Sequence, residues 1–171
     1  MPDVLIAAFD LPAGAPMKNF FFGSRYFAGG PGAIGILFLR IFVGLALASH
    51  GQGKIAAPFT WMGADGPPGF LQALAAVSEF LGGIAIILGF FTPLACLGVM
   101  STMFVAIMSQ MSSGNAFFVA PAGAKGANYE SPLGYFVMAL TIFLLGPGAV
   151  SLDAEWTKIM GLRKHGQTEI V

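Results

Sequence analysis

Four ionisable side chains lie within or beside apolar segments, and they are the residues best placed to do chemistry. Arg40 interrupts the apolar run 32–50, and Glu79 interrupts the apolar run 69–91. An ionised side chain at the centre of a bilayer costs about 2.5–3.5 kcal/mol even on the scale taken from insertion experiments. His50 and Lys54 end the first run, one turn apart if the helix continues. These four residues are therefore the candidate ligand-binding residues.

Arg40 and Glu79 are predicted to pair. Arg40 precedes His50 by ten residues and Glu79 follows Phe70 by nine, which places them roughly 15 Å and 14 Å from the same end of two antiparallel helices. We expect the guanidinium and the carboxylate to lie within about 4 Å of each other, or to share one ligand or water, because an unpaired buried charge is costly. The pair has two candidate roles. It locks the register of the two helices, or it lines a polar pocket for a ligand head group or a proton.

His50 and Cys96 have several candidate roles, and the sequence favours the simplest. His50 is an interfacial hydrogen-bonding residue, a partner for a quinone-like head group, or a ligand for a metal, haem or pigment. The only other histidine, His165, lies near the C-terminus, so no metal site is expected. Cys96 is the only cysteine, which excludes an intrachain disulfide or a CxxC redox pair. We interpret Cys96 as a small buried packing residue.

The elements that position these residues are membrane helices. The chain of 171 residues is 56% hydrophobic and 9% charged, whereas a soluble domain carries about 25% charge. The fold class is predicted as all-α, an integral membrane four-helix bundle with interfacial loops and a short C-terminal surface helix. The expected spans are 33–50, 70–91, 93–111 and a short fourth span, 132–146.

Several residues are predicted to serve structure rather than binding. Gly44, Gly82 and Gly83 are small residues at the depth of Arg40 and Glu79, where they would let helices approach closely. The final helix is expected over 151–163, with Ser151 as its N-cap and Asp153 in its first turn, where the helix dipole favours an acid. The loops 51–69 and 112–131 are rich in aromatic residues, and we expect them to pack on each other over the outer end of the bundle.

Topology follows from the basic residues. Four spans put both termini on one side, with Lys18, Arg25, Lys158, Arg163 and Lys164, against Lys54 and Lys125 on the other. This asymmetry predicts cytoplasmic termini.

Segment 1–31 has acidic residues and a short apolar run where a signal peptide needs positive charge. We interpret it as an irregular aromatic arm that either anchors at the membrane surface or docks on a partner subunit. The formal net charge of zero argues against a nucleic-acid partner.

A series of short motifs across residues 33–155 resembles the DoxX family. The motifs are Leu39–Arg40, Gly44, His50–Gly51, Lys54, Glu79, Leu81–Gly82–Gly83, Gly89, Pro93, Gly146–Pro147–Gly148 and Ser151–Leu152–Asp153. The resemblance implies a small four-helix protein of the bacterial or archaeal cytoplasmic (inner) membrane, associated with electron-transfer complexes such as thiosulfate:quinone oxidoreductase and terminal quinol oxidase. The expected organisation is an N-terminal arm (1–31), a four-span membrane domain (32–148), and a C-terminal surface helix and tail (149–171).

Three functions are carried forward from these observations. The first is an accessory membrane subunit of a respiratory or photosynthetic electron-transfer complex, more a non-catalytic subunit than an enzyme. The second is a quinone-reducing membrane subunit that uses Arg40, His50 and Glu79 for the head group. The third is a small permease-like protein. We expect no cofactor to be held by this chain alone, with a quinone, lipid or pigment at a subunit interface left open, and other integral membrane subunits and the lipid bilayer as partners.

Overall fold

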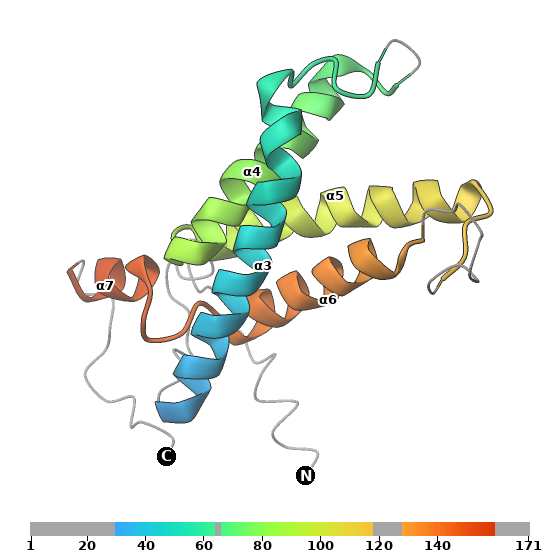
Figure 1. Ribbon diagram of the computed structural model, residues 1–171. Coiled ribbons are helices and arrows are strands. Elements are labelled where there is room, and N and C mark those ends of the chain that lie inside the picture. The colour runs from blue at the N-terminus through green and yellow to red at the C-terminus, as the bar shows by residue number, and fades with distance from the viewer. Residues whose placement is uncertain (1–29, 64–65, 118–127, 160–171) are drawn as a thin grey trace, which may run out of the picture.

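Helices make up most of the part of the chain that the structure describes, residues 30–63, 66–117 and 128–159 of a computed structural model (Figure 1). Apolar composition dictates this, because the backbone of a membrane segment must satisfy its hydrogen bonds internally. The helices are α3 (Gly30–Ala56), α4 (Gly69–Leu88), α5 (Thr92–Ser112), α6 (Glu130–Leu145) and α7 (Leu152–Ile159). Residues 1–29 of the predicted N-terminal arm and residues 160–163 of the predicted C-terminal helix lie outside the described residues, and the last two residues of the arm belong to α3.

Three of these helices are long and apolar enough to cross a bilayer. Their mean hydropathy is 2.1 for α3, 1.9 for α4 and 1.7 for α5. The fourth apolar helix, α6, has 16 residues. Its length of roughly 24 Å falls short of the hydrocarbon thickness of about 30 Å. The predicted all-α membrane fold is confirmed, and the chain is a multi-pass membrane protein.

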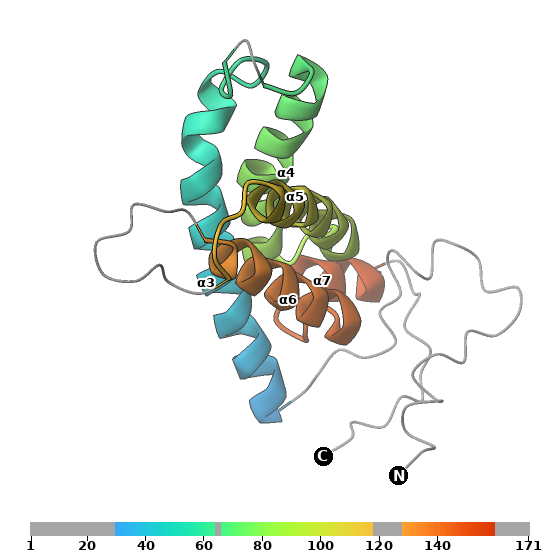
Figure 2. The same ribbon diagram turned by 90° about the vertical axis from the view of Figure 1, so that its right-hand side faces the viewer.

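The four apolar helices form two antiparallel hairpins. Helix α3 packs mainly on α4, and α5 packs on both α6 and α4. Figure 1 shows α3 and α4 rising steeply while α5 and α6 run across to the right, and Figure 2 gives the view along the second hairpin. The hairpins meet near the α4–α5 turn and diverge toward their other ends. A single core joins them, built from all four helices: Val43, Leu47, Ile86, Cys96, Val99, Met103, Ala139 and Ile142.

Glycine lets α3 and α4 approach until their backbones touch. A Cβ added to Gly44 would lie 2.6 Å from the Gly83 carbonyl oxygen, and one on Gly83 would lie 2.7 Å from the Gly44 carbonyl oxygen. No side chain fits at either position without moving a helix. Gly82 faces α5 instead, where an added Cβ would make an ordinary contact of 3.5 Å with Val99. The crossing of the first hairpin is therefore set by Gly44 and Gly83.

Two expectations about the loops are wrong. Helix α3 does not end at His50 but continues to Ala56, so the first loop is shorter than predicted. The described parts of the two long loops also do not form a joint cap. They lie at the far ends of the two hairpins, one at the top of Figure 1 and the other at its right. Residues 118–127 of the second loop lie outside the described residues.

Candidate functional site

Arg40 lies buried on α3, with 1% of its surface exposed, and binds four backbone carbonyls. Its Nε donates to Ile86 O at 2.8 Å, and its Nη2 donates to Ile87 O at 2.7 Å. Its Nη1 donates to Pro147 O at 2.5 Å and to Val150 O at 2.8 Å. The first two acceptors are among the last carbonyls of α4, which lack partners within the helix and carry the negative end of its dipole. Arg40 thus ties the end of α4 to the segment after α6.

Asp153 is an acidic residue that binds the N-terminus of the next helix, α5. Its two carboxylate oxygens accept hydrogen bonds from Phe91 N at 2.8 Å and Thr92 N at 2.9 Å, where α5 begins. Its own backbone N–H donates to Gly89 O at 2.8 Å. A carboxylate at a helix N-terminus is favoured by the orphan N–H groups and by the dipole. The α4–α5 turn is therefore capped on both sides, by a cation from α3 and an anion from α7.

Gly89 is the residue that leaves room for this arrangement. Its φ is +64°, in the left-handed region, and it ends α4 as a C-cap. A Cβ there would lie 2.6 Å from Arg40 Nη2 and 2.5 Å from Ser151 Cβ. Ser151 occupies the predicted N-cap position, since its Oγ accepts from Ala154 N at 3.2 Å. We call Arg40, Gly89, Ser151 and Asp153, with the carbonyls they bind, the arginine junction.

The predicted pair of Arg40 and Glu79 is wrong, and the length of α3 explains why. Because α3 runs to Ala56, Arg40 lies sixteen residues before its end, whereas Glu79 lies ten residues after the start of α4. At 1.5 Å per residue, the two side chains are offset by roughly 9 Å along the hairpin. Each satisfies its charge elsewhere, Arg40 on carbonyls and Glu79 on Lys54.

Glu79 and Lys54 form a second polar centre, toward the other end of the α3–α4 hairpin. Lys54 Nζ lies 2.6 Å from Glu79 Oε1 and 2.5 Å from Glu79 Oε2. The Glu79 side chain is 3% exposed and that of Lys54 is 24% exposed. The ammonium also lies 4.6 Å from the centroid of the Trp61 ring, within the range of a cation–π interaction. Lys54, Glu79 and Trp61 are called the ammonium site below.

His50 lies one turn before Lys54 on α3, and its contact is with Tyr135 of α6 rather than with Glu79 or the arginine junction. Its Nε2 is 3.5 Å from Tyr135 Oη, and the two rings meet edge to face with centroids 5.8 Å apart. His50 is exposed, so its hydrogen-bonding capacity is available to a neighbour. Cys96 lies buried in the core, as expected. Within the described ranges, no group of three or more histidine, cysteine or acidic residues could hold a metal ion.

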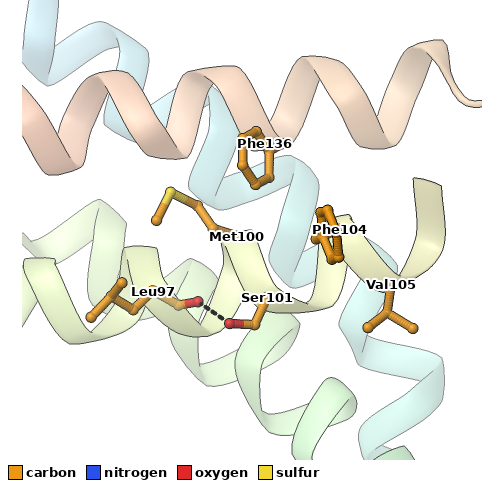
Figure 3. Close-up of a pocket in the computed structure, with 6 residues that line it drawn as sticks. All are labelled: Leu97, Met100, Ser101, Phe104, Val105 and Phe136. Carbon is orange, nitrogen blue, oxygen red and sulfur yellow. Dashed lines mark hydrogen bonds between the residues drawn. The ribbon is translucent and has the colours of Figure 1, made fainter. Parts of the chain in front are cut away.

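A shallow apolar groove of about 380 Å³ runs between α5 and α6. Met100 and Phe104 of α5 and Phe136 of α6 line it, as Figure 3 shows. Its one hydroxyl, on Ser101, donates to the Leu97 carbonyl at 2.8 Å within the same helix. The groove offers apolar contacts rather than hydrogen bonds.

Gln72, Tyr135 and the carbonyls that Arg40 binds contact residues of the candidate sites but were not predicted from the sequence. Gln72 is 3% exposed and organises the first loop, but it was read as part of an apolar span. A lone amide in such a run is a usable signal, because a buried polar group needs partners. Tyr135 gave no signal, since tyrosine is common near the ends of membrane helices. The partners of Arg40 are backbone carbonyls, and because every residue has one, the sequence gives no signal for them.

Comparison with known proteins places the chain in a family. Residues 35–112 match the family model described as DoxX. Inner membrane protein YqjF of Escherichia coli (strain K12) is 33% identical over 130 residues, covering 70% of this chain and 90% of that protein. An uncharacterised protein of Haemophilus influenzae (strain ATCC 51907 / DSM 11121 / KW20 / Rd) is 33% identical over 128 residues, covering 72% and 91%. No solved structure matches. The chain is therefore a membrane protein that belongs to the DoxX family.

Proposed function

We propose that this chain is an accessory integral membrane subunit of a larger electron-transfer complex, which it stabilises while shaping a quinone or lipid site at a subunit interface. The proposal rests on the partners of the charged residues in the membrane helices. Arg40, Lys54 and Glu79 are three of the four candidate ligand residues, and each is engaged by groups of this same chain. Charges committed to holding helices together are typical of a structural role.

The outer surface of the helices supports contacts with other membrane components. On α3, Phe38, Phe42 and Leu45 share one face and are 68%, 65% and 56% exposed. On α5, Phe104 and Val105 are 53% and 66% exposed. Large apolar side chains on a membrane helix contact either lipid or another subunit. The type of complex, respiratory or photosynthetic electron transfer, is what the resemblance to the family implies, and its setting would be the cytoplasmic (inner) membrane with both termini cytoplasmic.

A second function, a quinone-reducing subunit, is favoured by one contact. His50 and Tyr135 present two hydrogen-bonding groups 3.5 Å apart at the crossing of two helices, and His50 is exposed. Such a pair could hold the carbonyl or hydroxyl of a head group. Arg40 and Glu79 are not part of that site, because their hydrogen bonds lie elsewhere.

Site-specific photocrosslinking in native membranes tests the accessory role. A photoreactive phenylalanine analogue replaces Phe42, which is exposed, and in a matched variant it replaces Leu47, which is fully buried on the same helix. We expect Phe42 to cross-link to a second membrane protein and Leu47 to react only within the chain. The captured protein must co-purify with quinone-dependent oxidoreductase activity. A gently extracted, monodisperse monomer that itself shows quinone-dependent turnover would overturn the proposal and support the second function.

A further inference from the structure

The ammonium site has the chemistry of a receptor for an ammonium group. Lys54 Nζ directs two hydrogen bonds to the two oxygens of Glu79, at 2.6 and 2.5 Å, and lies over the Trp61 ring at 4.6 Å. A carboxylate supplies charge and acceptors, and an indole face supplies the strongest cation–π contact among side chains. The Lys54 ammonium fills the place between them.

The two receiving groups are held independently of Lys54. Trp61 Nε1 donates to the Gln72 backbone oxygen at 3.0 Å, which orients the indole. The Gln72 side chain accepts from Met62 N at 2.9 Å and donates to Pro67 O at 2.8 Å, which fastens the loop to α4. Glu79 is built into α4 and is almost fully buried. If the Lys54 side chain left, a carboxylate and an aromatic face would stay in place.

The Lys54 side chain is also the group best able to leave. It is 24% exposed, against 3% for Glu79. It comes from the last turn of α3, the end that faces the loop. A ligand arriving from the same end as the loop would meet Lys54 before it met Glu79.

We propose that Glu79 and Trp61 form a binding site for a primary ammonium group, which enters by displacing the Lys54 side chain. A primary ammonium fits because it supplies the two N–H donors that Glu79 accepts, which a quaternary ammonium lacks. Two sources carry this chemistry, a small alkylammonium ion in water and the head group of phosphatidylethanolamine. The site is separate from the subunit contacts proposed above, and its test uses the isolated chain.

Tryptophan fluorescence gives a direct readout of the site. The full-length chain has two tryptophans, so replacing Trp156, which lies on α7, with phenylalanine makes Trp61 the reporter. The probes are ethylammonium chloride, tetramethylammonium chloride and sodium chloride at equal ionic strength, added to protein in detergent micelles. We expect Lys54→Ala to show a saturable change with ethylammonium at a concentration at least tenfold below that needed by the protein that retains Lys54. Tetramethylammonium should act at least fivefold more weakly, and sodium not at all.

Matched variants separate the site from general effects. Adding Glu79→Gln to Lys54→Ala should abolish the saturable change in fluorescence. Adding Lys158→Ala to Lys54→Ala instead removes an exposed ion pair on α7, and this protein should respond as Lys54→Ala alone does. If Lys54→Ala does not fold, Lys54→Met, which keeps the volume of the lysine stem, takes the place of Lys54→Ala in every measurement. The lipid source is tested by comparing the thermal stability of the Lys54 variant in nanodiscs of phosphatidylethanolamine and of phosphatidylglycerol with the same acyl chains.

The outcomes decide both the site and its ligand. Saturable binding of ethylammonium that depends on Glu79, at low concentration in Lys54→Ala and at higher concentration in the protein that retains Lys54, supports the proposal with a water-borne ligand. A response confined to Lys54→Ala shows that no ligand displaces Lys54 and overturns it. Higher stability in phosphatidylethanolamine that is lost with Glu79→Gln supports it with a lipid ligand. A folded Lys54 variant that shows neither effect, or a response that survives Glu79→Gln, overturns it.

Discussion

Replacing Arg40 with methionine should release the C-terminal segment from the rest of the protein. Methionine has an unbranched apolar side chain that is shorter than that of arginine and has no hydrogen-bond donor, so the change removes the donors while still filling much of the volume of the stem. Four carbonyls lose the hydrogen bond from Arg40, two at the end of α4 and two in the segment after α6. The first pair lies in the last turn of α4, whose carbonyls have no N–H partner within the helix, and Ile86 O keeps only the bond from the Gly89 N–H at 3.2 Å.

The size of the effect can be bounded from these four bonds. Hydrogen bonds between membrane helices average about 0.6 kcal/mol, and bonds to charged groups contribute about 1.5 kcal/mol or more. Four bonds therefore span a range of about 2–6 kcal/mol. Removing the buried charge also removes its desolvation cost, which acts in the opposite direction. We expect the free energy of unfolding to fall by about 2–4 kcal/mol, the lower half of that range.

Two measurements check this prediction. The free energy of unfolding is measured by titrating purified protein in mixed micelles with sodium dodecyl sulfate, followed by circular dichroism. Local release is measured by thiol labelling of Thr157→Cys, because Thr157 is 3% exposed on α7 and the native Cys96 is buried. Labelling should rise at least tenfold in Arg40→Met but not in Lys158→Met, which loses only an exposed ion pair. An Arg40→Met protein that unfolds within 1 kcal/mol of the parent and keeps residue 157 protected would refute the reasoning.

Three further predictions concern other features of the chain. Gly89→Ala should lower the free energy of unfolding by about 1–3 kcal/mol in the same assay, because it forces a side chain into a left-handed φ of +64° against Arg40. Gly53→Ala is the control: its added Cβ meets nothing within 4 Å, so it should be neutral or stabilise by up to about 1 kcal/mol. Equal effects of the two changes would contradict the role of Gly89. In a double-mutant cycle, Lys54→Met and Glu79→Gln should show a coupling of about 1–3 kcal/mol, and strict additivity would mean that the ion pair contributes nothing. Cysteines placed at residues 3 and 168 should both be labelled only from the cytoplasmic side, and labelling from opposite sides would show that α6 does not cross the membrane.

The sequence was sufficient to predict the helices but not the partners of the buried charges. Long apolar runs mark membrane helices because the bilayer sets both their length and their composition. The end of α3 was placed at His50, where the apolar run stops, whereas the helix continues to Ala56 and Gly51 lets it pack against the backbone of Phe80. That error of six residues moved Arg40 to the wrong depth.

The two polar centres show which contacts a sequence can reveal. Lys54 and Glu79 were both identified as candidates, but their pairing depends on how the helices are offset along the hairpin. Arg40 binds carbonyls that belong to Ile86, Ile87, Pro147 and Val150. Any residue would provide the same oxygen, so no pattern of side chains points to these partners.

The long separation between Arg40 and its last acceptors bears on how the protein is made. Ribosomes add about 5–20 residues per second, and 107 residues separate Arg40 from Pro147. Once α3 and α4 have entered the membrane, Arg40 can bind Ile86 and Ile87, yet its other two bonds must wait roughly 3–13 s more for Pro147 and Val150 to be added. During that interval the Nη1 group of Arg40 lies inside the bilayer without these two hydrogen-bond acceptors. Completion of the chain therefore acts as the closing step of its insertion, and nascent chains stopped before Pro147 should be favoured substrates for membrane quality-control proteases.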